Sequence, residues 1–415
     1  MNNKRHTINQ GMLSTRITFT LIILTIFIIG RNIPLPLVDV EQSVNNSHFF
    51  EAISMATGGD IANLSVFVLG IGPYMSMMIL WRFITLGDFI DERKMPTRIV
   101  DRWKSILTLI IAIIQSLGIL SNVQFNQQIS FLNNYWLVLM ATCLFSVSGT
   151  FFLIWLGNQN ALFGFGNTTI IILAGIILKW VDFIKELFYL DSTMFSEVQL
   201  QFLLFLGCWI VFIFITSIFV ELSEQRVPLH RITLSGQFAN DSYLPIKLNP
   251  AGGLPIMYAL TVMSLPQYLF QALTLIIPNN KVLQYLILHL QMSDPLGVIT
   301  YACLIFGLGI GFAFVNISPR DLAEDLQKSG DYIANVPSGK PTYDYLTKKV
   351  GGMAFVGATW LTIATTVPWI IGLLEPSLSE VSTLVANVVI LVSIVATIIQ
   401  EIQTVYIRGQ YASIL

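Results

Sequence analysis

Charged residues are scarce in this sequence. Its 22 Lys and Arg and 24 Asp and Glu residues make up 11% of the 415 positions, whereas 54% are hydrophobic. A soluble domain carries roughly 25% charged residues, so this composition cannot cover a surface that faces water. We therefore predict an integral membrane protein, which excludes soluble enzymes, disordered chains and nucleic-acid-binding proteins.

Cysteine and histidine are also rare, and neither is clustered. Cys143, Cys208 and Cys303 lie in separate apolar runs, and the chain has only 4 His residues. This pattern predicts small buried thiols rather than disulfides or a zinc site, and we expect no metal and no cofactor. The HExxH motif of zinc proteases and a phosphate-binding glycine-rich loop are absent as well. We therefore do not expect an enzyme.

What the sequence does contain is apolar segments of membrane-spanning length. A bilayer core of about 30 Å needs roughly 20 mostly apolar residues per helix. The first segment follows Lys4, Arg5 and Arg16 as a secretory signal would, but no small-residue cleavage site follows it, so we expect it to be retained. Ten spans are predicted, at residues 17–33, 66–86, 104–121, 135–156, 168–188, 201–222, 252–277, 296–317, 351–374 and 382–406.

The basic residues predict the orientation of these spans. Most of the 22 Lys and Arg residues fall in the N-terminal segment, in the connections 82–104, 223–250 and 318–350, and near the C-terminus. Cytoplasmic loops carry an excess of Lys and Arg, so these parts and both termini are predicted to be cytoplasmic. The expected location is the cytoplasmic membrane.

Two glycine- and proline-rich breaks suggest a two-fold organisation. Gly70–Pro73 lies in the second span and Gly252–Pro255 in the seventh. Five spans per half give an N-terminal half at 1–190 and a C-terminal half at 191–415, of opposite topology. Broken segments at matching positions of inverted halves point to a substrate path. Two ordinary helix kinks would look the same.

The path carries little charge. The central parts of the ten spans lack Asp, Glu, Lys and Arg, whereas ion-coupled transporters need ionisable groups within the membrane. Within the segment 34–67 we predict a short amphipathic helix that begins at Phe49 and ends at Gly58 and Gly59. This helix either folds back into a cavity as a movable stopper or lies on the membrane surface. A passive channel is favoured, and a secondary transporter of a small or lipid-like solute is the alternative.

Several ordered motifs resemble those of the SecY family, the channel subunit of the protein-conducting translocon. The similarity covers nearly the whole chain, and its most specific run is Asn316–Gly330, which is similar to NPxExADNLKKSG. The other matching runs are Ile33–Asp39, Gly58–Gly59, Leu69–Ser76, Ile114–Gly118, Trp155–Gly157, Gly164–Asn167, Leu244–Gly252, Gln403–Thr404 and Gln410–Tyr411.

The resemblance implies an all-α polytopic fold, with ten transmembrane helices in two inverted five-helix halves, a short re-entrant plug helix and an hourglass pore. The implied plug spans about 49–65. The implied lateral gate lies between spans two and three on one side and spans seven and eight on the other. Gln115 is a candidate gate residue, although it could equally tie two helices together. An apolar pore ring disfavours hydrated ions by dewetting. The implied ring is Ile71, Met75, Ile172 (or its neighbour Ile171), Met257 and Ile390, and the implied plug residues are Phe50, Ile53, Met55, Gly58 and Gly59.

The resemblance also implies partners. These are a SecA-type ATPase motor, or a ribosome, SecE- and SecG-like small membrane subunits, and unfolded secretory preproteins as cargo. The motor would bind the loops after spans six and eight, although the cationic residues there could serve only to set topology. The candidates are Arg226, Arg231, Arg320, Lys328, Lys340, Lys348 and Lys349.

Three departures from the family pattern point to a subgroup. Pro337 stands where the family has an arginine at a loop tip, Leu384–Asn387 replaces a Gly-Gly-Thr-Ser run, and the loop after span six has only three cationic residues. These features resemble the accessory SecY paralogues of Gram-positive bacteria. Such paralogues serve a second SecA and export specific, often serine-rich glycosylated surface proteins.

Overall fold

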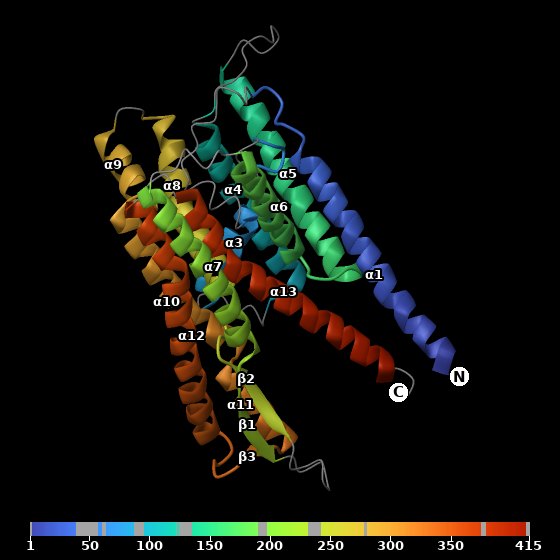
Figure 1. Ribbon diagram of the computed structural model, residues 1–415. Coiled ribbons are helices and arrows are strands. Elements are labelled where there is room, and N and C mark those ends of the chain that lie inside the picture. The colour runs from blue at the N-terminus through green and yellow to red at the C-terminus, as the bar shows by residue number, and fades with distance from the viewer. Residues whose placement is uncertain are drawn as a thin grey trace.

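The computed structural model describes residues 2–38, 57–59, 64–86, 95–121, 123, 135–189, 197–230, 242–277, 280–374 and 379–411. Within these residues the chain is mostly helical (Figure 1). The long helices of the N-terminal half are α1 Asn2–Arg31, α3 Gly72–Leu86, α4 Thr97–Leu120, α5 Tyr135–Phe163 and α6 Thr169–Tyr189. Those of the C-terminal half are α7 Glu197–Leu222, α8 Leu254–Thr274, α10 Pro295–Asn316, α12 Lys340–Leu374 and α13 Ser379–Tyr411.

Each predicted span coincides with one of these helices, which confirms the predicted fold class. Among the described residues, seven helical segments are long and apolar enough to cross a membrane. Several helices begin or end at other residues than the predicted spans, and two of these differences have a clear local cause. The second span becomes helical only at Gly72 instead of at residue 66, because residues 64–71 form turns. The ninth begins at Lys340 instead of at residue 351, because its polar first turns stay helical where they pack on a sheet.

The sheet was not predicted. In the described part of the chain, β1 Glu224–His230 lies between β2 Tyr243–Lys247 and β3 Tyr332–Ile333, and both pairings are antiparallel. Its apolar side packs on α11 Pro319–Ser329 and on the start of α12. This small core contains Val227, Leu229, Ile246, Ala323, Ile333, Leu346 and Val350. We call the part of the molecule that carries β1–β3 and α11 the sheet end, and the opposite part, which carries α9 Lys281–His289, the far end (Figure 1).

Short-range signals explain how α11 begins and ends. The Ser318 hydroxyl accepts a hydrogen bond from the backbone N–H of Asp321 at 3.3 Å, as an N-cap does. Gly330 has φ of 77°, the left-handed conformation that ends many helices. The helix therefore has the length that its own sequence dictates, which fixes the position of its exposed charges on the sheet end.

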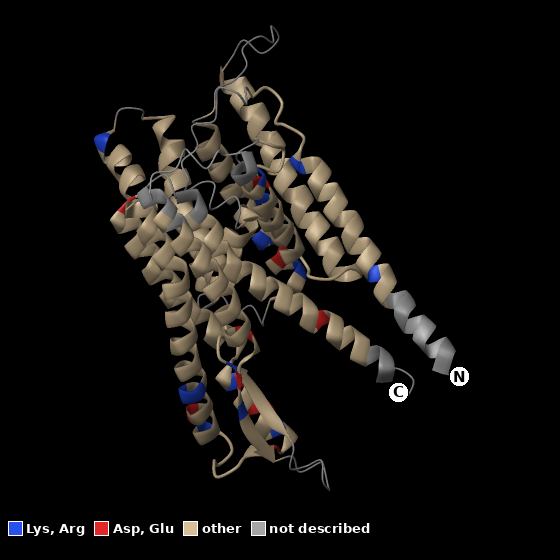
Figure 2. Ribbon diagram, viewed as in Figure 1, with Lys and Arg blue, Asp and Glu red and all other residues tan. Residues whose placement is uncertain are grey.

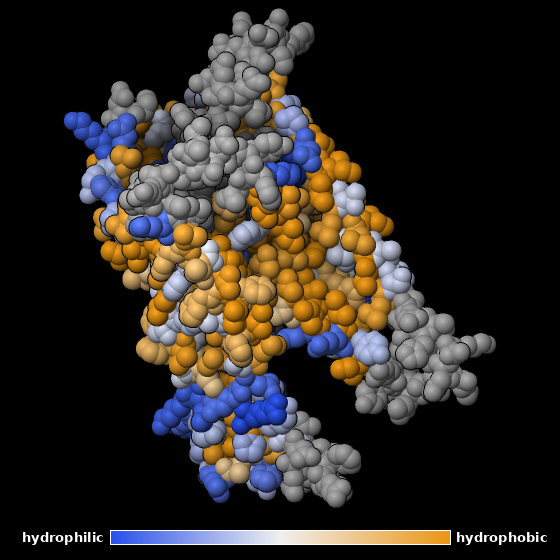
Figure 3. Space-filling view, viewed as in Figure 1, coloured by the Kyte–Doolittle hydropathy of each residue, from blue (hydrophilic) through white to orange (hydrophobic). Residues whose placement is uncertain are grey.

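The surface divides into an apolar band and a polar end. Figure 3 shows hydrophobic residues over the helices and hydrophilic ones over the sheet end. Lys and Arg residues gather on the sheet end and at the start of α12 in Figure 2. Large apolar side chains point outward from the helices, among them Leu144, Leu204 and Phe219. Such a continuous exposed apolar belt fits a lipid environment rather than water.

The two halves contact each other along two fronts. On one side α3 and α4 pack against α8, and on the other α1 and α6 pack against α13. Buried residues from both fronts meet in one large apolar core, and Met77, Trp81, Val100 and Ile111 of α3 and α4 form a separate smaller cluster. A path through the molecule would therefore run between these two fronts.

Candidate pore

The five predicted ring residues are all buried and belong to the large apolar core. Their exposed fractions are 1% for Ile71, 5% for Met75, 1% for Ile172, 1% for Met257 and 0% for Ile390. They come from the start of α3, from α6, from α8 and from α13, so both halves contribute. Ile171 is buried as well, at 0% exposed, and belongs to the same cluster.

The first glycine–proline break positions Ile71 and Met75. Gly70 has φ of 56°, a left-handed conformation that L side chains rarely adopt, and a Cβ there would run into the carbonyl oxygen of Thr57. The backbone N–H of Ile71 donates to that same oxygen at 2.9 Å. The irregular backbone before α3 is thus covered by protein, as the low polarity of a membrane interior requires.

The second break packs the start of α8 against α13. The backbone N–H of Gly253 donates to the Ser393 hydroxyl at 2.8 Å. A Cβ on Gly253 would lie only 3.3 Å from the Cα atom of Ile390, so the two helices approach closely at the level of the ring. This contact brings Met257 and Ile390 into the same cluster.

The end of the predicted plug lies beside the ring. A Cβ on Gly58 would lie 3.1 Å from the carbonyl oxygen of Ile171, and one on Gly175 would lie 2.8 Å from the Cα of Gly58. Gly58 therefore rests on α6, and Gly59 rests on the turn that precedes α3. The plug candidates Phe50, Ile53 and Met55 lie outside the described residues.

A cavity of about 340 Å³ lies between residues of α6, α7, β2, α8 and α13, and Met257 of the predicted ring belongs to its lining. Part of its wall is polar. Lys247 Nζ lies 3.4 Å from Glu221 Oε1 and 3.2 Å from Gln400 Oε1, and Glu401 accepts a hydrogen bond from the backbone N–H of Gly166 at 2.8 Å. The lining comprises Gly166, Asn167, Thr169, Glu221, Lys247, Asn249 to Leu254, Met257, Asn316, Ser393, Ile394, Thr397, Gln400 and Glu401.

Sequence reasoning named Met257 as a ring residue but did not find the polar contacts in the wall of this cavity. Glu221 and Glu401 were recognisable as charges near the ends of spans, but their partners come from elements far away in the sequence. The missing signal is the juxtaposition of α7, β2 and α13, which depends on how the halves fold together. The cavity thus combines polar groups from α7, β2 and α13 with one of the predicted ring residues, Met257.

Gln115 lies inside the N-terminal half. Its Nε2 donates to the Ser76 hydroxyl at 3.2 Å, which ties α4 to α3. The contact between the halves is made one turn further on by Gly118, where a Cβ would lie 2.7 Å from the carbonyl oxygen of Tyr268 on α8. The sequence motif contained Gly118, but nothing in it indicated this close approach of two helices.

The described motor-binding candidates all lie on the sheet end. Arg226 on β1 bonds Glu224 at 2.9 Å and stacks on the Tyr243 ring, and the neighbouring carboxylate raises the pKa of the Arg226 guanidinium, which therefore stays charged. Arg320 and Lys328 flank Glu324 on the exposed face of α11. Lys340 and Lys348 are exposed and Lys349 is half-buried on α12. Arg231 lies outside the described residues.

Comparison with known proteins adds independent information. The family model described as SecY matches residues 65–399. The chain is 36% identical to the accessory Sec system protein translocase subunit SecY2 of Leuconostoc gelidum subsp. gasicomitatum, over 98% of each chain. It is 32% identical to the protein of that name from Streptococcus sanguinis, over 96% of this chain and 97% of the relative.

Solved structures of protein-conducting channels share the fold. One, described as the structure of a protein conducting channel, superimposes with a TM-score of 0.71 at 16% identity and covers 96% of this chain and 94% of the other. Another is described by the role of the SecY plug domain in stabilising the closed channel. It has a TM-score of 0.69 at 15% identity, and the match covers 96% of this chain and 93% of the other.

Proposed function

The chain belongs to the SecY family, and from this membership we propose that it is the pore-forming subunit of an accessory protein translocase that passes unfolded secretory polypeptides across the bacterial membrane. The observation that carries the proposal is the buried apolar cluster Ile71, Met75, Ile172, Met257 and Ile390. These five buried residues come from both halves, and one of them, Met257, lines a cavity whose wall is partly polar. A chain entering from the sheet end would meet water first and the constriction second.

The chemistry of the constriction suits a varied cargo. Two of the five ring residues are Met, whose unbranched thioether adapts to side chains of different shape. An apolar ring also keeps hydrated ions out when it is closed. We propose a plug at about 49–65 that leaves when the pore opens, and the contact of its described residue Gly58 with Ile171 on α6 supports this position.

The gate follows from the two halves. We assign residues 1–190 and 191–415 to halves that separate between α3 and α4 on one side and α8 and α10 on the other, while the contact of α1 and α6 with α13 persists. This motion would open the pore sideways into lipid. A secondary transporter of a small solute is less well supported, because the ring offers no polar group with which to bind one.

The motor would dock on the sheet end. Its exposed Arg and Lys residues suit an acidic surface electrostatically, and such complementarity raises the association rate. We propose a SecA-type ATPase as this partner, together with SecE- and SecG-like small subunits in the membrane, and both termini in the cytoplasm.

Reconstitution tests the proposed function. Vesicles containing the purified protein, with an accessory SecA, ATP and the small subunits, should protect a secretory precursor from external protease. Vesicles without ATP serve as the control. Uptake of small solutes without precursor protection would contradict the proposal.

A binding comparison tests the accessory assignment separately. The two likenesses to SecY2 proteins at 32% identity or more support it. The protein should retain an accessory SecA in a pull-down more strongly than a housekeeping SecA. Equal retention of both motors would contradict the subgroup but not the channel.

A further inference from the structure

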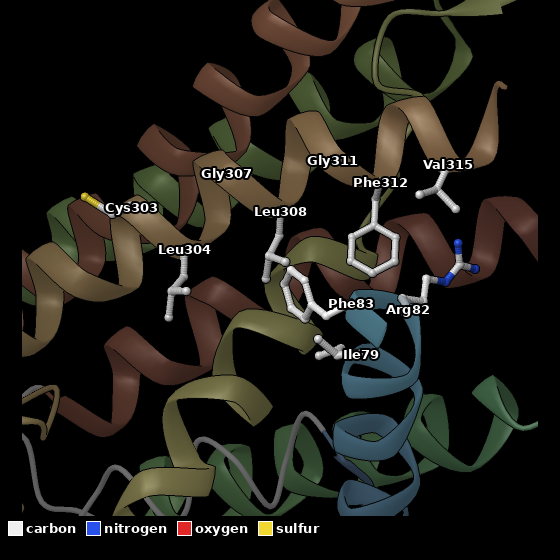
Figure 4. Close-up of a pocket in the computed structure, with 10 residues that line it drawn as sticks. All are labelled: Ile79, Arg82, Phe83, Cys303, Leu304, Gly307, Leu308, Gly311, Phe312 and Val315. Carbon is white, nitrogen blue, oxygen red and sulfur yellow. The ribbon is translucent and has the colours of Figure 1, made fainter. Parts of the chain in front are cut away.

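An apolar groove of about 310 Å³ runs along the outside of the bundle between α3 and α10 (Figure 4). Helix α3 belongs to the N-terminal half and α10 to the C-terminal half, so the groove lies where the halves meet at the surface. It is lined by Ile79, Arg82, Phe83, Cys303, Leu304, Gly307, Leu308, Gly311, Phe312 and Val315.

One wall of the groove is formed by small residues. Cys303, Gly307 and Gly311 recur every four residues and form an exposed stripe on α10. A Cβ on Gly307 or Gly311 would meet nothing within 4 Å, so space remains above both glycines. In Figure 4, Leu304 and Leu308 point from α10 toward α3, and Phe83 of α3 lies beside Leu308. The result is an elongated apolar channel on a surface that the exposed apolar belt places in lipid.

One end of the groove is charged. Arg82 lies beside Phe312 and Val315, at the end of α3 that leads toward the sheet end, and Figure 4 shows its guanidinium beyond the apolar side chains. The guanidinium carbon lies 5.4 Å from the centre of the Phe312 ring. Among the residues that the structure describes, no carboxylate forms an ion pair with Arg82. Its charge is therefore available at the edge of the apolar belt.

We propose that this groove binds an anionic phospholipid, with one acyl chain lying between α3 and α10 and the headgroup phosphate on Arg82. A guanidinium presents a planar fork of donors that matches a phosphate group. Basic pockets between membrane helices on the cytoplasmic side bind anionic headgroups in this way. An apolar groove with a cation at one end fits a lipid, whose own charge lies at one end of an apolar chain.

The site has a consequence for the gate. A lipid in the groove contacts both halves at once, so it has to shift when α3 and α10 move apart. The bound lipid thus stabilises the closed arrangement. This role adds a ligand to the channel and does not depend on which polypeptide the channel carries.

Photo-crosslinking with lipids tests the proposal directly. The purified channel is placed in vesicles with a phospholipid that carries a diazirine on its acyl chain and either a phosphatidylglycerol or a phosphatidylcholine headgroup. Mass spectrometry then quantifies labelling of the α10 peptide 295–316 against the lipid-exposed α7 peptide 204–222. The phosphatidylglycerol to phosphatidylcholine ratio should be about fivefold higher at α10, the preference that one cation near the surface gives.

Two variants and one control sharpen the test. Arg82→Gln should lower the α10 ratio to that of α7, whereas Arg98→Gln, an exposed arginine at the start of α4, should leave it unchanged. Gly307→Leu fills the groove and should reduce α10 labelling by both lipids, and thermal unfolding verifies that this variant folds. Equal ratios at α10 and α7 in the unmodified protein would overturn the proposal. So would an unchanged ratio in Arg82→Gln, or labelling of the groove by a synthetic secretory leader peptide and by neither lipid.

Discussion

We propose that the five ring side chains act by being apolar and buried, and none of them carries a reactive role. Replacing Met75 and Ile390 together by Gly removes two side chains that are 5% and 0% exposed. We expect a several-fold rise in ion conductance of the resting channel in planar bilayers, because a wider constriction no longer excludes water.

A matched control for the ring uses the same residue types on the lipid face. Met140 and Ile363 are 64% and 57% exposed. The double variant Met140→Gly with Ile363→Gly therefore loses as much helix stability as the ring variant and leaves the ring residues unchanged. Its conductance should equal that of the unmodified channel. Equal conductance of the ring variant and this control would count against the ring assignment.

The ring could be assigned from sequence only through the family resemblance. In a chain that is 54% hydrophobic, no local pattern separates Ile390 from any other isoleucine of a membrane helix. The polar cavity could not be predicted even with the family resemblance. Lys247 and Gln400 meet across 153 positions of sequence, and only the fold brings them together.

The contact between α4 and α8 can be tested with a single methyl group. A Cβ on Gly118 would lie 2.7 Å from a backbone oxygen of Tyr268, and backbone cannot move aside as a side chain can. We expect Gly118→Ala to destabilise the closed arrangement by about 1–3 kcal/mol, the usual cost of overpacking, and to lower the midpoint of thermal unfolding in detergent.

Gly207 on α7 provides the control for that substitution. A Cβ there would meet nothing within 4 Å, so Gly207→Ala should be neutral or stabilise the protein by up to about 1 kcal/mol through helix propensity. If both variants unfold at the same temperature, then α4 and α8 do not pack as closely as described.

The sheet end can be tested through its charge. Reversing Arg226, Arg320 and Lys328 to Glu should weaken binding of the SecA-type motor roughly tenfold or more, because like charges facing each other cost several kcal/mol. Surface plasmon resonance with the channel in nanodiscs measures this. Lys281→Glu changes an exposed charge at the far end and should leave binding unchanged. Full-strength binding of the triple variant would place the motor elsewhere.

Helices were easier to predict than the sheet for a physical reason. An apolar run of about 20 residues specifies a membrane helix by itself. The strands are short, β1 and β2 contain Pro228 and Pro245, and β3 joins the sheet from a position about 100 residues away. Their pairing depends on packing against α11 and α12, so the loops 223–250 and 318–350 gave no strand signal.

The two halves together explain why the chain carries so little charge along its path. Cations gather on the sheet end, where a motor would supply the energy, and the ring between the halves is apolar (Figure 2). The family and the ten-helix arrangement could be predicted from the sequence because ordered motifs extend over most of the chain. The close approach of helices at Gly118 and Gly253 could not be predicted and is seen only in the structure.

The most direct measurement is a crosslink between the ring and a polypeptide in transit. Cys143, Cys208 and Cys303 are replaced by Ala, Met257→Cys is introduced, and a precursor with one cysteine is stalled in the channel by a folded C-terminal domain. With copper phenanthroline added as the oxidant, we predict an ATP-dependent disulfide between Met257→Cys and the precursor, and none with Met140→Cys on the lipid face. A channel that translocates the precursor and never crosslinks at Met257→Cys would contradict the proposed pore.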